Sequence, residues 1–326
     1  MRVLRSIAAG ILCCCAAFSQ SARVLTRGEK IQIILNQPYT QTVPPIWSGR
    51  ALLVLIVNET REPVLDVITA DGLTEEVRFQ MPDWPHLRVV SLWGGDDGEI
   101  VAAGSGTTDQ NEPGSFIVRI SAGRAKRTYI PVENLNIQAM TVGPGGVIWA
   151  VGSGKNLEDD SKHDNILTRF SPTGKVLTST MLKFAPDRYG VNVASGSRMR
   201  SSADRVAWLT NRNEYIEFAT DGTVMTRVAG PGGKEPSDMF STAFAVSAAN
   251  TALVSKFTYG KDHKPPKLNI WTLDRVKQNW FLSEPSDEEF PYSTSICGFD
   301  GDTLMTSGFE RHLGALLVRY TLSETK

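Results

Sequence analysis

Short apolar runs separated by polar turns follow one another along most of the chain. The runs are rich in Val, Ile, Phe, Trp and Thr, and turns such as Asp-Gly and Thr-Gly separate them at intervals of about 8 to 12 residues. β-Branched and aromatic residues favour strands, and these turns favour antiparallel hairpins. After the first twenty or so residues, no apolar pattern with the helical period persists for three turns. The sequence therefore predicts an all-β protein.

One unit of about fifty residues recurs along the chain. The copies at 87–130 and 137–183 show it most clearly, and each contains four predicted strands joined by tight turns. Both copies place Gly-Ser-Gly at the end of the second strand, at 104–106 and at 152–154, and both carry Ile/Leu-x-Arg-Ile/Phe in the third strand. Weaker copies lie at 51–79, 206–228, 252–282 and 303–320.

Six units of four strands predict a six-bladed β-propeller, in which each unit forms one antiparallel sheet, or blade. The last unit lacks a fourth strand after Tyr320. The segment Lys30 to Leu35 is a predicted strand without a unit of its own, and we expect it to close the ring by pairing with the last blade. The propeller would then be a single domain over residues 22–326. A pair of β-sandwiches is the alternative all-β architecture.

The third unit resembles the repeats of a known group of propellers. Its strands at 137–151 flank a Pro-Gly-Gly turn, and the phrase Arg-Phe-Ser-Pro-Thr-Gly-Lys-Val follows at 169–176. This arrangement is similar to that of NHL-type and streptogramin-lyase-like six-bladed propellers, and the likeness covers two units, about a third of the chain. NHL repeats often carry Asp after the second strand, where this chain has Ala103-Gly104 and Gly152-Ser153. The resemblance implies the fold and no catalytic residue.

The first residues have the composition of a secretory signal peptide. Arg2 and Arg5 precede a 12-residue uncharged run, Ile7 to Phe18, and small residues ending at Ser21 offer a cleavage site. The run is shorter than the roughly 20 apolar residues that a membrane span needs. We therefore expect residues 1–21 to be removed and the mature chain to be exported to the bacterial periplasm or exterior, without a membrane span. A buried N-terminal helix or strand is the alternative.

Charge and cysteine content narrow the possible partners. Lys and Arg number 34 against 35 Asp and Glu, so no basic field indicates a nucleic-acid ligand. Cys13, Cys14 and Cys15 lie in the signal segment, which leaves Cys297 as the single cysteine of the mature chain. No intramolecular disulfide can then form, and we expect Cys297 to be a buried, inert thiol. We expect the mature protein to be a monomer.

Candidate ligand-binding residues collect in one class of loop. Loops from the second to the third strand, and from the fourth strand to the next blade, emerge at the same face of a propeller, and all four histidines fall in them. The candidates are Trp84, His86, Asp160, His163, Asp164, Asp262, His263, Glu310, Arg311 and His312.

Two functions are compatible with this face. Imidazoles and carboxylates could hold a divalent cation or act as general acid and base, which would suit a metal-assisted hydrolase or lyase. Trp84, between two prolines, suits contact with a carbohydrate or peptide. The inner strands offer hydroxyl groups but no matching set of carboxylates (Ser91, Thr141, Ser201, Ser202, Ser247 and Ser295). We therefore favour a binding or scaffolding module for a protein, peptide or carbohydrate over an enzyme. Polar residues are also ordinary in exposed loops that bind nothing.

Overall fold

The computed structural model describes fourteen stretches of the chain, which are residues 23–33, 40–41, 43–57, 62–81, 84–110, 112–133, 135–154, 165–182, 198–211, 213–231, 239–257, 268–283, 295–310 and 314–324. The expected signal peptide lies outside them. Within these residues no helix is long and apolar enough to cross a membrane. The one helical turn described is the 3-10 turn Pro144–Gly146.

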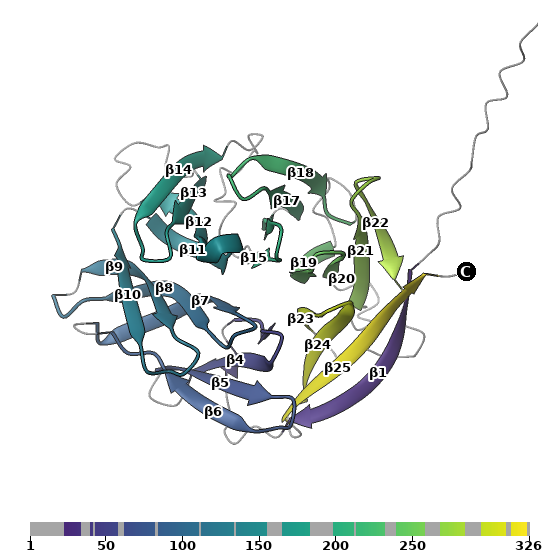
Figure 1. The fold of residues 1–326 in the computed structure, drawn as a ribbon, viewed down its shortest axis with the longest axis horizontal. Coiled ribbons are helices and arrows are strands. Elements are labelled where there is room, and N and C mark those ends of the chain that lie inside the picture. Colours follow the sequence, from purple (N-terminus) through teal and green to yellow (C-terminus); the bar gives the residue numbers. More distant parts are fainter. Residues whose placement is uncertain are drawn as a thin grey trace, which may run out of the picture.

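Six antiparallel sheets stand around a central axis, so the protein is a six-bladed β-propeller (Figure 1). In blades 2 to 6 the first strand of each sheet lies at the centre of the ring, and later strands lie progressively farther out. The turns that begin the second strands fall where the repeat predicts them, for example at Gly95–Glu99 and Ser202–Arg205. The expectation of six blades is thereby confirmed.

The strands have the following bounds. Blade 1 contains β2 (Thr40–Gln41), β3 (Ile46–Trp47), β4 (Ala51–Val57), β5 (Pro63–Thr69) and β6 (Thr74–Arg78). Blade 2 contains β7 (His86–Gly94), β8 (Ile100–Thr107), β9 (Pro113–Ile120) and β10 (Arg127–Val132). Blade 3 contains β11 (Leu135–Val142), β12 (Ile148–Gly154), β13 (Asn165–Phe170) and β14 (Val176–Leu182).

The second half of the ring follows the same plan. Blade 4 contains β15 (Arg198–Ser201), β16 (Val206–Leu209), β17 (Glu214–Phe218) and β18 (Val224–Ala229). Blade 5 contains β19 (Met239–Val246), β20 (Thr251–Phe257), β21 (Leu268–Asp274) and β22 (Asn279–Ser283). Blade 6 contains β23 (Ser295–Asp300), β24 (Thr303–Glu310) and β25 (Gly314–Glu324).

The first and last sheets depart from the regular plan. The innermost position of blade 1 is shared by β2 and β3, which pair with different parts of β4. In the last sheet, β1 (Arg23–Ile33) runs antiparallel to β25 and carries a register shift between Arg27 and Lys30. The strand predicted at 30–35 thus starts earlier in the chain, at Arg23.

The repeated Gly-Ser-Gly has a structural reason. The inner strands β7 and β11 each bulge, which brings their backbones close to the second strands β8 and β12. A Cβ atom on Gly104 would lie 2.0 Å from the carbonyl oxygen of Arg88, and one on Gly152 would lie 2.0 Å from that of Asn136. Only glycine fits such a close approach of two backbones, so glycine recurs at the first position of this phrase in neighbouring blades.

The hydrophobic core lies between the blades. Trp149 of blade 3 and Trp208 of blade 4 are fully buried in one cluster that joins the two sheets, and Trp271 is half-buried between blades 4 and 5. Large aromatic side chains fill the widening space between sheets that radiate from an axis. The expectation that these tryptophans pack between blades is confirmed.

Hydrogen bonds join consecutive blades at one end of the ring. We call this end, which carries the turns between first and second and between third and fourth strands, the turn face, and the opposite end the loop face. Side chains near the turn face donate hydrogen bonds across every junction from blade 1 to blade 6. The pairs are Arg50 with the Asp97 carbonyl, Arg119 with that of Pro172, Arg169 with that of Thr220, Arg205 with that of Ala248, and Asn250 with the Asp302 carboxylate.

Candidate functional site

The described residues include only part of the predicted site. Trp84 and His86 are described in full, whereas Glu310 is described only as the last residue of β24. The other candidates lie outside the described residues, and they are Asp160, His163, Asp164, Asp262, His263, Arg311 and His312. The convergence predicted for these side chains is therefore untested.

Trp84 and His86 lie beside each other at the loop face of blade 2. The Trp84 ring is half-buried and meets Phe116 edge to face, with ring centroids 5.9 Å apart. A Cβ atom on Gly114 would lie 2.1 Å from the Trp84 ring, so the indole covers that glycine closely. His86 is exposed as the first residue of β7. Trp84 therefore packs on its own blade with part of its surface, while the His86 imidazole is open to solvent.

Two arginines on the inner strand of blade 4 were not anticipated. Arg198 and Arg200 are two residues apart in β15, so their side chains project from the same face of the strand. Met199 between them is buried with Trp149 and Trp208 in the core that joins blades 3 and 4. The arginines therefore project from the opposite face of β15, at its loop-face half, and both are partly exposed.

The electrostatics of Arg200 place its charge near the axis. Burial, together with the like charge of Arg198, lowers the pKa of Arg200 to about 10. Its charge also acts on the thiol of Cys297, which belongs to β23 two blades away. Since β15 and β23 are both innermost strands (Figure 1), these groups can be close only across the axial region.

Hydrogen bonds tie the inner strands together at their turn-face ends. Ser201 donates to the carbonyl of Val142 over 2.6 Å, and its hydroxyl lies 3.1 Å from that of Thr141. Trp93 of blade 2 donates to Ser201 of blade 4 over 3.2 Å, which links two blades that are not consecutive. Two of the predicted inner-strand hydroxyls, Thr141 and Ser201, thus help to link blades 2, 3 and 4 at this end.

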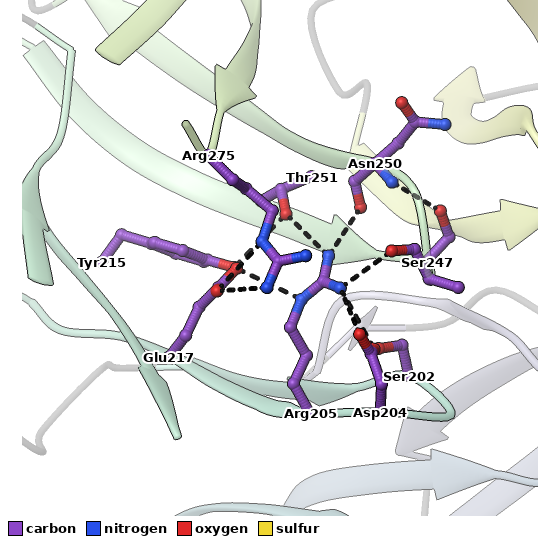
Figure 2. Close-up of polar contacts among 10 residues, drawn as sticks. Ser202, Asp204, Arg205, Tyr215, Glu217, Ser247, Asn250, Thr251 and Arg275 are labelled. Carbon is purple, nitrogen blue, oxygen red and sulfur yellow. Dashed lines mark hydrogen bonds and ion pairs between the residues drawn. The ribbon is translucent and has the colours of Figure 1, made fainter. Parts of the chain in front are cut away.

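A second group of polar side chains lies between blades 4 and 5 (Figure 2). Arg205 Nε lies 3.2 Å from a carboxylate oxygen of Glu217, and both side chains have no exposed surface. Arg275, from the turn before β22, lies 3.0 Å from the other oxygen, and the Tyr215 hydroxyl donates to Glu217 over 2.7 Å. Burial and the charge of Glu217 raise the pKa of Tyr215, which stays protonated as that donor. Arg205, Glu217 and Tyr215 have no exposed surface, and of these four groups only Arg275 reaches solvent. The network is therefore a structural clamp between the two blades.

Metal and nucleophile chemistry have little support among the described residues. No three His, Cys, Asp or Glu side chains of this part of the chain gather closely enough to hold a metal ion. Cys297 is fully buried, and burial raises the pKa of its thiol to about 12. A thiol in that state is a poor nucleophile, which agrees with the inert role expected for it.

Neither protein-family models nor curated proteins give a relative of this chain. No protein-family model matches the chain, and no curated protein matches it significantly. The class that the structure defines is the six-bladed β-propeller.

Proposed function

We propose that this protein is an exported binding or scaffolding propeller that recognises a protein, peptide or carbohydrate through its loop face. The observation that carries the proposal is a difference between the two ends of the ring: one end joins the blades, and the other exposes polar residues. Polar groups of the turn face join each blade to the next from blade 1 to blade 6. At the other end, His86 and Arg88 of β7 are exposed, and Arg198 and Arg200 of β15 are partly exposed. A ring whose described loop-face residues include exposed polar side chains suits recognition.

The N-terminal strand supports the ring in this proposal. β1 pairs with β25 over residues Arg23 to Ile33, and we propose that this pairing closes the ring and covers the outer edge of the last blade. An exposed sheet edge would otherwise be open to aggregation. Because β1 would directly follow the cleaved signal segment, closure would be completed after export. We also propose a relation to NHL-type or streptogramin-lyase-like propellers. The phrase at 169–176 in the third unit supports that relation, at the level of the repeat only.

Binding arrays with face-specific variants test the proposed function. Residues 22–326 would be labelled and applied to peptide and glycan arrays, and each hit would be measured again with two variants. His86→Ala removes an exposed imidazole of the loop face, and Val276→Ser removes an exposed side chain of the turn face. We expect hits to weaken with His86→Ala and to persist with Val276→Ser. Hits that weaken only with Val276→Ser would contradict recognition through the loop face.

A further inference from the structure

Positive charge dominates the innermost strands. The described inner strands carry three arginines, Arg88 on β7 and Arg198 and Arg200 on β15. Their only carboxylate is Asp300, which lies at the turn-face end of β23. The arginines of β15 lie at the loop-face half of that strand, so Asp300 and the arginine pair occupy opposite ends of the ring. Within the described inner strands, the charge at the loop-face half is therefore positive.

The two arginines of β15 repel each other. Burial lowers the pKa of both groups, and the charge of Arg198 lowers that of Arg200 further. Arg200 donates from one terminal nitrogen to the carbonyl oxygen of Met199 over 2.9 Å, and its Nε has no hydrogen-bond partner among the described residues. A buried donor without a partner and a like-charged neighbour both cost stability. An anion beside Arg200 would remove both costs.

The guanidinium group favours one chemistry of ligand. Its planar fork matches the two oxygens of a carboxylate or the oxygens of a phosphate, and such charge-assisted bonds are stronger than neutral ones. Arg205 differs in this respect, because the carboxylate of Glu217 lies 3.2 Å from its guanidinium group and balances its charge. Arg200 instead faces a like charge. We propose that Arg200, with Arg198, binds an oxyanion, a carboxylate or phosphate group of the ligand, at the loop-face end of the axis. This inference rests on the proposed function and names the group that the face recognises.

Thermal unfolding with two probe anions tests this inference. Residues 22–326 would be melted with inorganic phosphate, with succinate, or with sodium chloride at the same ionic strength. A probe at about 100 times its Kd is expected to raise Tm by about 4 °C over chloride in a protein of this size. A response to succinate alone would identify carboxylate as the bound group, and a response to phosphate alone would identify phosphate.

Two variants of Arg200 and one control complete the test. Arg200→Gln is expected to abolish the response to the probe and to raise Tm in chloride, because the repulsion of Arg198 is gone. Arg200→Lys keeps the charge and loses the fork, so binding should weaken by about tenfold. Arg127→Gln alters an exposed arginine on the outer strand β10 and should respond as the unmodified chain does. A wild-type chain that responds to neither anion, or an Arg200→Gln variant that responds fully, would overturn the inference.

The outcome is separable from that of the proposed function. Array hits that weaken with His86→Ala but persist with Arg200→Gln would support recognition through the loop face and reject the oxyanion. A response to phosphate or succinate that depends on Arg200, together with array hits that weaken only with Val276→Ser, would support the anion site and reject the loop face as the recognition surface.

Discussion

Replacement of Glu217 by Gln is the most incisive test of how the blades are held together. The substitution keeps the shape of the side chain and removes the charge that faces Arg205 and Arg275 (Figure 2). Gln can still accept the Tyr215 hydroxyl. The Arg205 side chain, with no exposed surface, then keeps the carbonyl oxygens of blade 5 and the half-exposed carboxylate of Asp204 as partners.

The size of the effect follows from the burial of the pair. Removal of one partner of a buried ion pair costs about 3 to 5 kcal/mol where the other charge is left uncompensated. The low end of that range, about 3 kcal/mol, applies here because Asp204 still pairs with Arg205. A protein of about 300 residues unfolds with an entropy of about 0.6 kcal/mol/K. Glu217→Gln should therefore lower Tm by about 5 °C.

A matched control exists in blade 2. Glu99 and Arg119 form the corresponding pair at 2.7 Å, but their side chains are 21% and 15% exposed, respectively. Solvent screens this pair only in part, so Glu99→Gln should cost less than Glu217→Gln, about 1 to 2 kcal/mol, which is a fall in Tm of about 2 to 3 °C. Calorimetry of both variants at one scan rate measures the difference. Equal falls in Tm, or no fall with Glu217→Gln, would refute the argument from burial.

Three further predictions concern stability and reactivity. Burial and then the charge of Glu76 raise the pKa of Asp66. The ionised carboxylate therefore costs stability above that raised pKa, and the protonated group costs nothing below its ordinary pKa. Asp66→Asn should raise Tm at about pH 7 and leave Tm unchanged at about pH 3. In residues 22–326, Cys297 should resist alkylation by iodoacetamide until the protein is unfolded, and rapid labelling of the folded chain would contradict its burial. Deletion of residues 24–36 should abolish folding, and a soluble truncated protein with cooperative unfolding would reject closure by β1.

The fold was predictable because every repeat carries the same local signals, which are turn residues and strand-forming residues at fixed spacing. Each blade needs turn residues at fixed positions, and each unit shows them in the sequence. The glycines at 104 and 152 recur because the same bulge recurs opposite them. The exact limits of β1 were less predictable, since a strand that joins a distant blade carries no repeat signal of its own. The strand predicted at 30–35 is described from Arg23 to Ile33, and residues 34 and 35 lie outside the described part of the chain.

The arginines at the axis were less accessible to sequence reasoning. Arg198 and Arg200 belong to the short inner strand of blade 4, whose residues before the turn carry weak strand signals. Their relation to Cys297 exists only after six sheets have closed around an axis, since nearly a hundred residues separate them in the chain. The alternation of charged and apolar residues at 198–200 was the available signal. Two charges on an innermost strand are unusual enough to mark a candidate site.

The ion pairs of blades 2 and 4 have the acid and the arginine at exchanged positions, and this exchange affects which blade can pack next to each. In blades 2 and 4, the last residue of the first turn pairs with the penultimate residue of the third strand, as Glu99 with Arg119 and as Arg205 with Glu217. Arg119 also donates to a carbonyl in the turn of blade 3, whereas blade 5 supplies Arg275 to Glu217. An arginine in place of Glu217 would meet the positive charge of Arg275. Blades 2 and 4 are therefore matched to the blades that follow them, and this matching favours one order of blades over register-shifted or swapped arrangements of similar sheets.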